Sequence, residues 1–141
     1  MKILIALDGS PQSLAALGTL GQRLSWFRDN PELTLVYVHP PLPYQRAVSW
    51  AGKDAVHAYY DEESEASLAE ARKLLESRKI AHKIEKRIGD PATEIIDCAA
   101  TGGFDLIVMG THGRTALVNL VLGSVATKVL AGSKIPVLFL H

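Results

Sequence analysis

The sequence predicts an α/β domain of the doubly wound, Rossmann-like type, in which a five-stranded parallel sheet carries helices on both faces. Five short apolar or β-branched runs alternate with four stretches of helical periodicity, which is the pattern of repeated strand–helix–strand units. The length of 141 residues corresponds to about one domain, and no linker-like stretch or internal repeat divides it. We therefore expect one domain over residues 1–141.

The first strand and the first helix are predicted near the N-terminus. The segment from Lys2 to Leu7 is continuously apolar after its first residue, as expected of a buried strand. Ser10 is a suitable helix N-cap, and Pro11 suits the first helical position. Apolar and small residues then follow on one helix face, and the two glycines among them are expected to allow close packing on the sheet. These residues are Leu14, Leu17, Gly18, Gly21 and Leu24.

The middle of the chain predicts a strand, a loop and a long charged helix. Leu33 to Val38 is rich in β-branched residues, and the prolines after it open a loop from His39 to about Lys53. From Asp54 to Lys79 acidic residues precede basic ones, which is the order that a helix dipole favours, and we interpret these charges as a solvated face. The residues expected to face the core are Tyr60, Ser64, Leu68, Ala71 and Leu75.

The second half of the chain continues the alternation. It predicts a half-exposed or edge strand from Ile80 to Ile88, a helix from Asp90-Pro91 to Gly102-Gly103, a buried strand from Phe104 to Met109, a helix from Ser124 to Ala131 and a last strand from Ile135 to Leu140. Pro136 within the last strand places that strand near a sheet edge. An uncovered apolar edge invites pairing with another strand.

Composition excludes several classes of function. Lys+Arg and Asp+Glu number 15 each, so the formal net charge is zero, which argues against a nucleic-acid binder. The single cysteine, Cys98, cannot form an internal disulfide and is expected to be a small core residue; no Cys/His spacing resembles a zinc site. The apolar run before Asp8 is too short for the core of a signal peptide, and no apolar run reaches the ~18 residues of a membrane span. We expect a cytoplasmic protein that binds neither nucleic acid nor membrane.

A possible anion site lies in the loop after the predicted fourth strand. Ligands of doubly wound sheets bind outside the carboxyl ends of the strands, where the strand order reverses. Gly110 and Gly113 let the backbone turn and approach a ligand, and Gly123-Ser124 opens a helix whose first N–H groups favour an anion. Arg114 adds a guanidinium suited to phosphate oxygens. The alternative is that the glycines serve only a turn and a close helix packing.

Other nucleotide-binding and catalytic signatures are absent from the sequence. It contains no P-loop, no Gly-x-Gly-x-x-Gly after the first strand and no Gly-x-Ser-x-Gly elbow. Asp8 is either an anchor for the turn that follows it or a residue on the sugar or magnesium side of a nucleotide, because a carboxylate repels phosphates. His112 either points to solvent or assists a phosphate, and His39 could border an adenine pocket. We assign no catalytic residue and no protein-held metal.

The spacing Gly-x-x-Gly-x9-Gly-Ser, from Gly110 to Ser124, resembles the ATP-binding signature of the universal stress protein family. Further segments are similar to the family in the same order along the chain. They are Asp8-Gly9-Ser10, Val38-His39, Gly89-Asp90-Pro91 and Pro136-Val137-Leu138. The resemblance therefore extends over essentially the whole chain, and the strand order that we expect is 3-2-1-4-5, with adenosine between strands 1 and 4.

The resemblance implies a role for each matching residue. Asp8 would reach the base or sugar, and Val38 would read the adenine edge through its backbone. Met109 and Gly110 would flank the ribose, and Val125 would contribute backbone groups. The phosphates would be held by Gly113, Arg114, Gly123 and Ser124. The implied ligand is ATP, or AMP or ADP, together with Mg²⁺, and the implied assembly is a homodimer through the last strand. Ala126 departs from the family, many of whose ATP-binding members carry Ser or Thr there.

Three hypotheses about function follow. The first is a nucleotide-liganded stress-response module that senses ATP without turning it over. The second is a weak ATPase or an autophosphorylating enzyme, with Ser124 or His112 as the reacting residue. The third is a dimeric scaffold that binds no nucleotide, which the departure at Ala126 favours.

Overall fold

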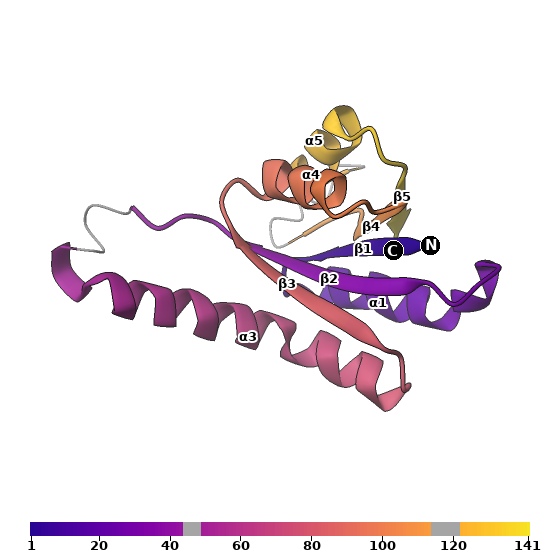
Figure 1. The fold of residues 1–141 in the computed structure, drawn as a ribbon, viewed down its shortest axis with the longest axis horizontal. Coiled ribbons are helices and arrows are strands. Elements are labelled where there is room, and N and C mark those ends of the chain that lie inside the picture. Colours follow the sequence, from indigo (N-terminus) through magenta and orange to yellow (C-terminus); the bar gives the residue numbers. More distant parts are fainter. Residues whose placement is uncertain (44–48, 114–121) are drawn as a thin grey trace.

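The computed structural model describes residues 1–43, 49–113 and 122–141, and these contain one parallel sheet in the order β3-β2-β1-β4-β5 (Figure 1). The strands are β1 (Lys2–Leu7), β2 (Glu32–His39), β3 (His82–Ile88), β4 (Leu106–Gly110) and β5 (Val137–Leu140). Central β1 pairs in parallel with β2 on one side and β4 on the other. The predicted fold class and strand order are confirmed.

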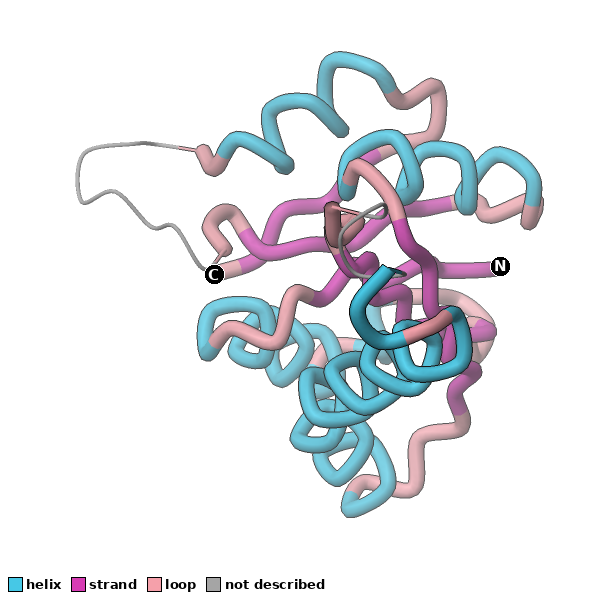
Figure 2. The backbone as a smooth tube through the Cα atoms, turned by 90° about the vertical axis from the view of Figure 1, so that its left-hand side faces the viewer, coloured by secondary structure: helices cyan, strands magenta, loops and turns pink. Residues whose placement is uncertain are grey.

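Helices cover both faces of the sheet, as predicted (Figures 1 and 2). They are α1 (Pro11–Gln22), the short 3₁₀ helix η1 (Leu24–Trp26), α3 (Lys53–Ser77), α4 (Pro91–Thr101) and α5 (Ser124–Gly132). β1 supplies both layers of the core, because its side chains alternate between the two faces. Ile3 and Ile5 pack with α1 and α3, whereas Leu4 and Ala6 pack with α4 and α5.

Helix α1 begins as predicted but buries a different face. Ser10 Oγ accepts a hydrogen bond from the Ser13 backbone N–H at 3.1 Å and caps the helix. The buried residues are Ser13, Ala16, Leu17 and Leu20, so the face is rotated from the predicted one. The prediction that the glycines pack on the sheet is therefore wrong: a Cβ at Gly18 would meet Leu74 of α3, and one at Gly21 would meet Arg78, just beyond α3.

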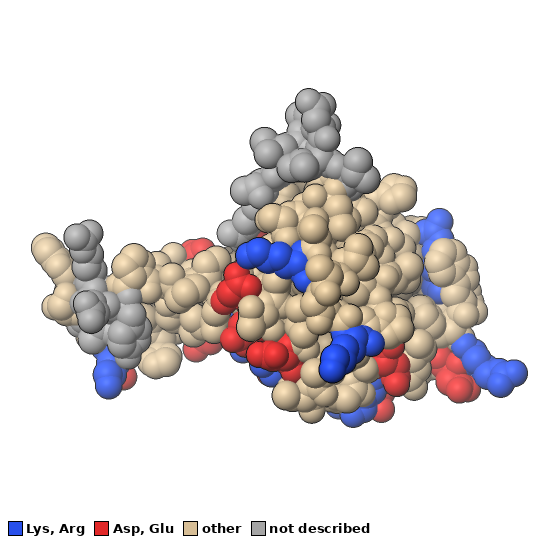
Figure 3. All heavy atoms as spheres, turned by 90° about the horizontal axis from the view of Figure 1, so that it is seen from above, with Lys and Arg blue, Asp and Glu red and all other residues tan. Residues whose placement is uncertain are grey.

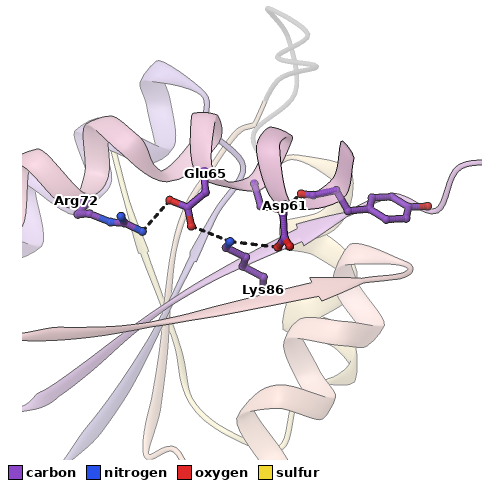
Figure 4. Close-up of polar contacts among 6 residues, drawn as sticks. Asp61, Glu65, Arg72 and Lys86 are labelled. Atoms are coloured by element: carbon purple, nitrogen blue, oxygen red, sulfur yellow. Dashed lines mark hydrogen bonds and ion pairs between the residues drawn. The ribbon is translucent and has the colours of Figure 1, made fainter. Parts of the chain in front are cut away.

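Helix α3 buries all five residues that the sequence pattern placed inward, and it buries Val56 as well. Its outer side is tied to β3 by charge pairs (Figure 4). Lys86 Nζ lies 2.7 Å from Glu65 Oε1 and 3.3 Å from Asp61 Oδ1, and Arg72 Nη2 lies 2.9 Å from Glu65 Oε2. The hydrogen bond from Lys86 holds the pKa of the Glu65 carboxyl below its usual value. The charges interpreted as a solvated face thus also hold α3 to the edge strand.

The two edge strands match the sequence prediction in place and differ from it in length. β3 is a half-exposed edge strand, as expected. β5 forms the other edge but begins after Pro136, which the sequence placed inside the strand. Proline has no N–H to donate to a ladder, although the Pro136 carbonyl still accepts a hydrogen bond from the Ile107 N–H at 2.9 Å.

Cys98 is buried in the core between the sheet and α4, and burial raises the pKa of its thiol. It behaves as the small core residue that was predicted. Figure 3 shows acidic and basic side chains interspersed on the face seen from above, without a broad area of one sign. In the part of the chain that the structure describes, no helix has the length and apolar character needed to cross a membrane.

Candidate functional site

A cavity of about 430 Å³ opens at the carboxyl ends of β1, β2 and β4. The strand order reverses beside β1, because β2 continues the sheet in one direction and β4 in the other. In doubly wound sheets this reversal leaves a crevice between connections that leave toward opposite faces. The cavity therefore lies where the fold class predicts a ligand.

The structure brings the sequence-predicted site residues together around this cavity. Eight of them line it: Asp8, Val38, Met109, Gly110, Gly113, Gly123, Ser124 and Val125. The ninth, Arg114, lies outside the described residues. These residues come from three strand ends and one helix N-terminus that are up to about a hundred positions apart in the chain, so their convergence is a property of the fold.

Further lining residues were not among the predicted site residues, although one alternative for His112 was that it assists a phosphate. They are Ala6, Leu7, Ser13, Tyr37, Pro40, Pro91, Ile95, Thr111, His112 and Ala126. Most are apolar and form walls suited to a flat ring or a sugar. A signal for Pro91 was present, because it follows the carboxyl end of β3, whereas Ile95 carried no signal beyond the apolar face of α4.

The glycines of the loop, Gly110, Gly113 and Gly123, differ in which atoms lie next to them: backbone for Gly110 and Gly123, and the Asp8 side chain for Gly113. A Cβ at Gly110 would come within 3.3 Å of the His112 carbonyl oxygen, and one at Gly123 within 3.4 Å of the Thr111 carbonyl oxygen. The Gly123 N–H also donates to the Thr111 carbonyl at 2.8 Å, which closes the loop on itself. Close backbone packing thus accounts for Gly110, whereas the contact of a Cβ at Gly123 would be an ordinary van der Waals contact and a Cβ at Gly113 would collide with the Asp8 carboxylate.

Helix α5 begins at the cavity without a side-chain cap. Its N-cap is Gly123, and the first three helical residues, Ser124, Val125 and Ala126, line the cavity. The first N–H groups of any helix lack partners within the helix. By contrast, α1 and α4 have side-chain oxygens of Ser10 and Asp90 as caps. The N-terminus of α5 therefore presents backbone donors and the positive end of a helix dipole to the cavity.

Asp8 both anchors the turn after β1 and lines the cavity. Its Oδ1 accepts hydrogen bonds from the Ser10 backbone N–H at 3.0 Å and from the Ser10 hydroxyl at 2.6 Å. Its Oδ2 faces Gly113. The interpretation of Asp8 as an anchor of the turn is thus confirmed, and its other oxygen lies beside the glycine loop, while its role toward a nucleotide stays a prediction.

The two histidines of interest lie in different surroundings. His39 is buried, its Nδ1 lies 2.6 Å from the Pro40 carbonyl oxygen, and its ring packs edge-on against Tyr60 at 4.9 Å between centroids. It is not a cavity residue, so the expectation that it borders the pocket is wrong: His39 points to the α3 side of the sheet. His112 does line the cavity, and its Nδ1 lies 3.0 Å from Thr111 Oγ1.

The described residues offer little to hold a metal on their own. Nowhere within residues 1–43, 49–113 and 122–141 do three or more His, Cys, Asp or Glu side chains gather as a metal site would require. Asp8 is the one carboxylate in the described lining of the cavity. A hard cation at this place would need most of its oxygen ligands from a bound molecule.

Comparison with known proteins gives a consistent result. Residues 1–141 match the model of the Universal stress protein family. Universal stress protein MJ0531 of Methanocaldococcus jannaschii is 33% identical over 137 residues, which cover 97% of this chain and 79% of that protein. The solved structure of hypothetical protein MJ0577 superposes with a TM-score of 0.79 at 28% identity, covering 99% of this chain and 94% of that one. A universal stress protein in complex with cAMP has the same fold, with a TM-score of 0.68 at 24% identity and coverage of 100% and 96%.

Proposed function

This chain belongs to the universal stress protein family, and from that premise we propose that it is an ATP-binding stress-response module. The nucleotide would occupy the cavity at the carboxyl ends of β1, β2 and β4. AMP or ADP would fit the same chemistry, since all three share the adenosine part. Because the fold neighbour bound to cAMP carries an adenine nucleotide, this class of ligand is the first to test.

The strongest support is the N-terminus of α5. Three successive backbone N–H groups, those of Ser124, Val125 and Ala126, begin the helix at the cavity, and the N-cap residue Gly123 has no side chain to cap them. A helix N-terminus of this kind carries about half a positive charge, and its N–H groups donate hydrogen bonds to phosphate oxygens. Ala126 is buried and offers no hydroxyl, so the phosphate contacts proposed here are backbone contacts and the Ser124 hydroxyl.

The apolar part of the cavity lining suits adenosine. Met109 and Ile95 supply apolar surface, and Val38 brings the backbone of the β2 end to the wall. A volume of about 430 Å³ lies within the range of about 300–1,000 Å³ typical of small-molecule sites. We assign the adenine edge to the Val38 backbone and the ribose to Met109 and Gly110.

Asp8 restricts how the nucleotide is oriented. A carboxylate close to phosphates repels them unless a cation intervenes. Asp8 would therefore face a ribose hydroxyl or a Mg²⁺ ion that arrives on the phosphates. The Mg²⁺ would supply charge neutralisation, while the protein residues bind and orient the nucleotide. No residue is assigned as a catalyst, so the proposed role is binding; steady phosphate release that is lost in Asp8→Ala or Ser124→Ala would support the enzymatic hypothesis instead.

The proposal is tested by denaturing the purified protein and identifying any released small molecule by mass, and by titrating the nucleotide-free protein with Mg-ATP. Saturation at a hundredfold excess over Kd stabilises the folded state by about 2.7 kcal/mol, which raises the melting temperature by several degrees. A protein that releases no nucleotide and whose melting temperature is unmoved by Mg-ATP would be the non-binding scaffold.

Gly113→Val is expected to abolish binding of Mg-ATP while the protein remains folded. The added side chain would enter the space between Gly113 and the Asp8 carboxylate and displace that carboxylate. Gly18→Ala is a matched control, because its Cβ would make an ordinary 3.8 Å contact with Leu74 far from the cavity. If Gly113→Val gave the same calorimetric titration heats with Mg-ATP as the wild type, the glycine loop would not be part of the binding site.

We also propose a homodimer through β5. Its side chains are apolar, those of Val137 to Phe139 are partly exposed, and it forms an edge of the sheet. Phe139→Asp or Val137→Lys is expected to yield monomers in sedimentation velocity, because a charged side chain on an edge strand opposes its pairing with a second strand. Lys83→Asp changes a charge on the opposite edge strand, β3, and should leave the sedimentation coefficient unchanged. An unchanged value for both β5 variants would contradict the proposal.

A further inference from the structure

The turn between β1 and α1 contains a buried residue that lies behind the cavity rather than in it. Ser10 is 5% exposed, and it is not among the residues that line the cavity. It stands between Asp8, which does line the cavity, and the first turn of α1. Any influence of Ser10 on a bound molecule must therefore pass through Asp8 or the helix.

Ser10 uses its hydrogen-bonding capacity in both directions. Its hydroxyl donates to Asp8 Oδ1 at 2.6 Å, and its backbone N–H donates to the same oxygen at 3.0 Å. The hydroxyl oxygen also accepts from the Ser13 N–H at 3.1 Å. Hydrogen bonds to an ionised carboxylate are shorter and stronger than neutral ones, and the 2.6 Å distance falls in their range. One side chain thus fixes a carboxylate and caps a helix.

The other side of the Asp8 carboxylate lies against the glycine loop. Oδ2 occupies the space into which a Cβ at Gly113 would project. The carboxylate is therefore held between two donors of Ser10 and the backbone of Gly113. A rotation that broke the Ser10 hydrogen bonds would carry the carboxylate into a different part of the cavity.

We propose that Ser10 is a positioning residue of the nucleotide site: it orients the Asp8 carboxylate against Gly113 and so sets nucleotide affinity without touching the nucleotide. This inference rests on the proposed function. It also explains why this cap is not an aspartate. Asp and Asn are equally good helix N-caps, but an ionised Asp has no proton to donate and would place a second negative charge beside Asp8. The cap of α4, Asp90, differs, because its carboxylate accepts from Thr93 and pairs with the positively charged Lys128.

The test compares Mg-ATP dissociation constants, measured by calorimetry, for the wild type, Ser10→Gly, Ser10→Thr and Asp90→Gly. Glycine retains most of the N-cap stability of a helix, so Ser10→Gly removes the hydroxyl with little loss of the cap. We expect Ser10→Gly to bind about tenfold more weakly, as the loss of a hydrogen bond to a charged group predicts. Ser10→Thr, which keeps the hydroxyl, should stay within about twofold of the wild type, and Asp90→Gly should not change affinity.

The outcomes separate this inference from the proposed function. A wild type that does not bind Mg-ATP overturns the proposed function and the inference with it. A wild type that binds, together with a Ser10→Gly variant of equal affinity, overturns the inference alone and leaves Ser10 as a helix cap. If Ser10→Gly does not fold, Ser10→Ala replaces it. In a double-mutant cycle of Asp8→Asn with Ser10→Gly, the free energy of unfolding is measured with urea in the absence of nucleotide, and the two substitutions should be coupled. Additive changes in the free energy of unfolding would contradict the orientation of Asp8 by Ser10.

Discussion

Helices α4 and α5 begin at the same end of the sheet, and their N-termini both contribute to one cavity, yet their N-cap residues differ. Helix α4 begins at Asp90, whose carboxylate accepts from the Thr93 backbone N–H at 3.1 Å and from the Thr93 hydroxyl at 3.0 Å. Helix α5 begins at Gly123, which has no side chain to cap it. Pro91 and Ile95 of α4 therefore offer the cavity apolar surface, whereas α5 offers it backbone donors.

The difference between the two N-caps shows how helices of one sheet can give a cavity two chemically different walls. An N-terminus that is capped by an Asp carboxylate has its N–H groups satisfied within the protein, and the negative charge of the carboxylate repels anions. An uncapped N-terminus at a cavity needs water or a ligand. The choice of a single residue, Asp90 or Gly123, thus decides whether the N-terminus of the helix has a side-chain acceptor of its own.

The largest effect is expected from giving α5 the cap of α4. Gly123→Asp is compatible with the backbone, since φ is −67° and ψ is 159° at this position. The carboxylate would satisfy the first N–H groups and repel phosphates, so Mg-ATP should bind about a hundredfold more weakly, while the nucleotide-free protein should melt a few degrees higher. Gly123→Asn caps without charge and should lose less affinity. Binding by Gly123→Asp at wild-type strength would show that the phosphates lie elsewhere.

A smaller effect is expected from removing the cap of α4. Asp90→Ala should lower the melting temperature by a few degrees, because the Thr93 N–H loses its side-chain acceptor. The affinity for Mg-ATP should stay as in the wild type, since Asp90 is not a cavity residue. If Asp90→Ala lowered both the melting temperature and the affinity for Mg-ATP, the cap of α4 and the binding of nucleotide at α5 would not be independent.

The smallest effect is a pH dependence of the α4 cap. The Thr93 N–H and hydroxyl hold the pKa of the Asp90 carboxyl below its usual value. A carboxyl whose pKa is lower in the folded state stabilises the fold above its unfolded pKa of about 4, and that contribution is lost as the pH falls through the folded pKa. The difference in urea midpoint between the wild type and Asp90→Ala should therefore narrow from pH 7 to strongly acidic pH. A constant difference would assign the effect of Asp90 to something other than its charge.

The elements that were predicted well are those with a strong local signal. The inward face of α3 follows from apolar spacing between Tyr60 and Leu75, and the start of α4 follows from the Asp90 cap and Pro91. The buried face of α1 was predicted wrongly because Gly18 and Gly21 were assumed to face the sheet, whereas they give room to Leu74 and Arg78. Glycine tolerates close approach from any side, so its position in a sequence does not say which neighbour will approach.

The amino-acid sequence by itself determined the class of the fold, the helix caps and the glycine-rich segment, because these depend on residues adjacent in the chain and on their periodicity. The tertiary structure alone decided which neighbours those residues acquired: that Asp8 lies between Ser10 and Gly113, that Ile95 forms a cavity wall, and that His39 turns to the α3 side. Contacts between segments up to about a hundred residues apart are set by how strands are ordered and helices packed, and no local pattern encodes their distances.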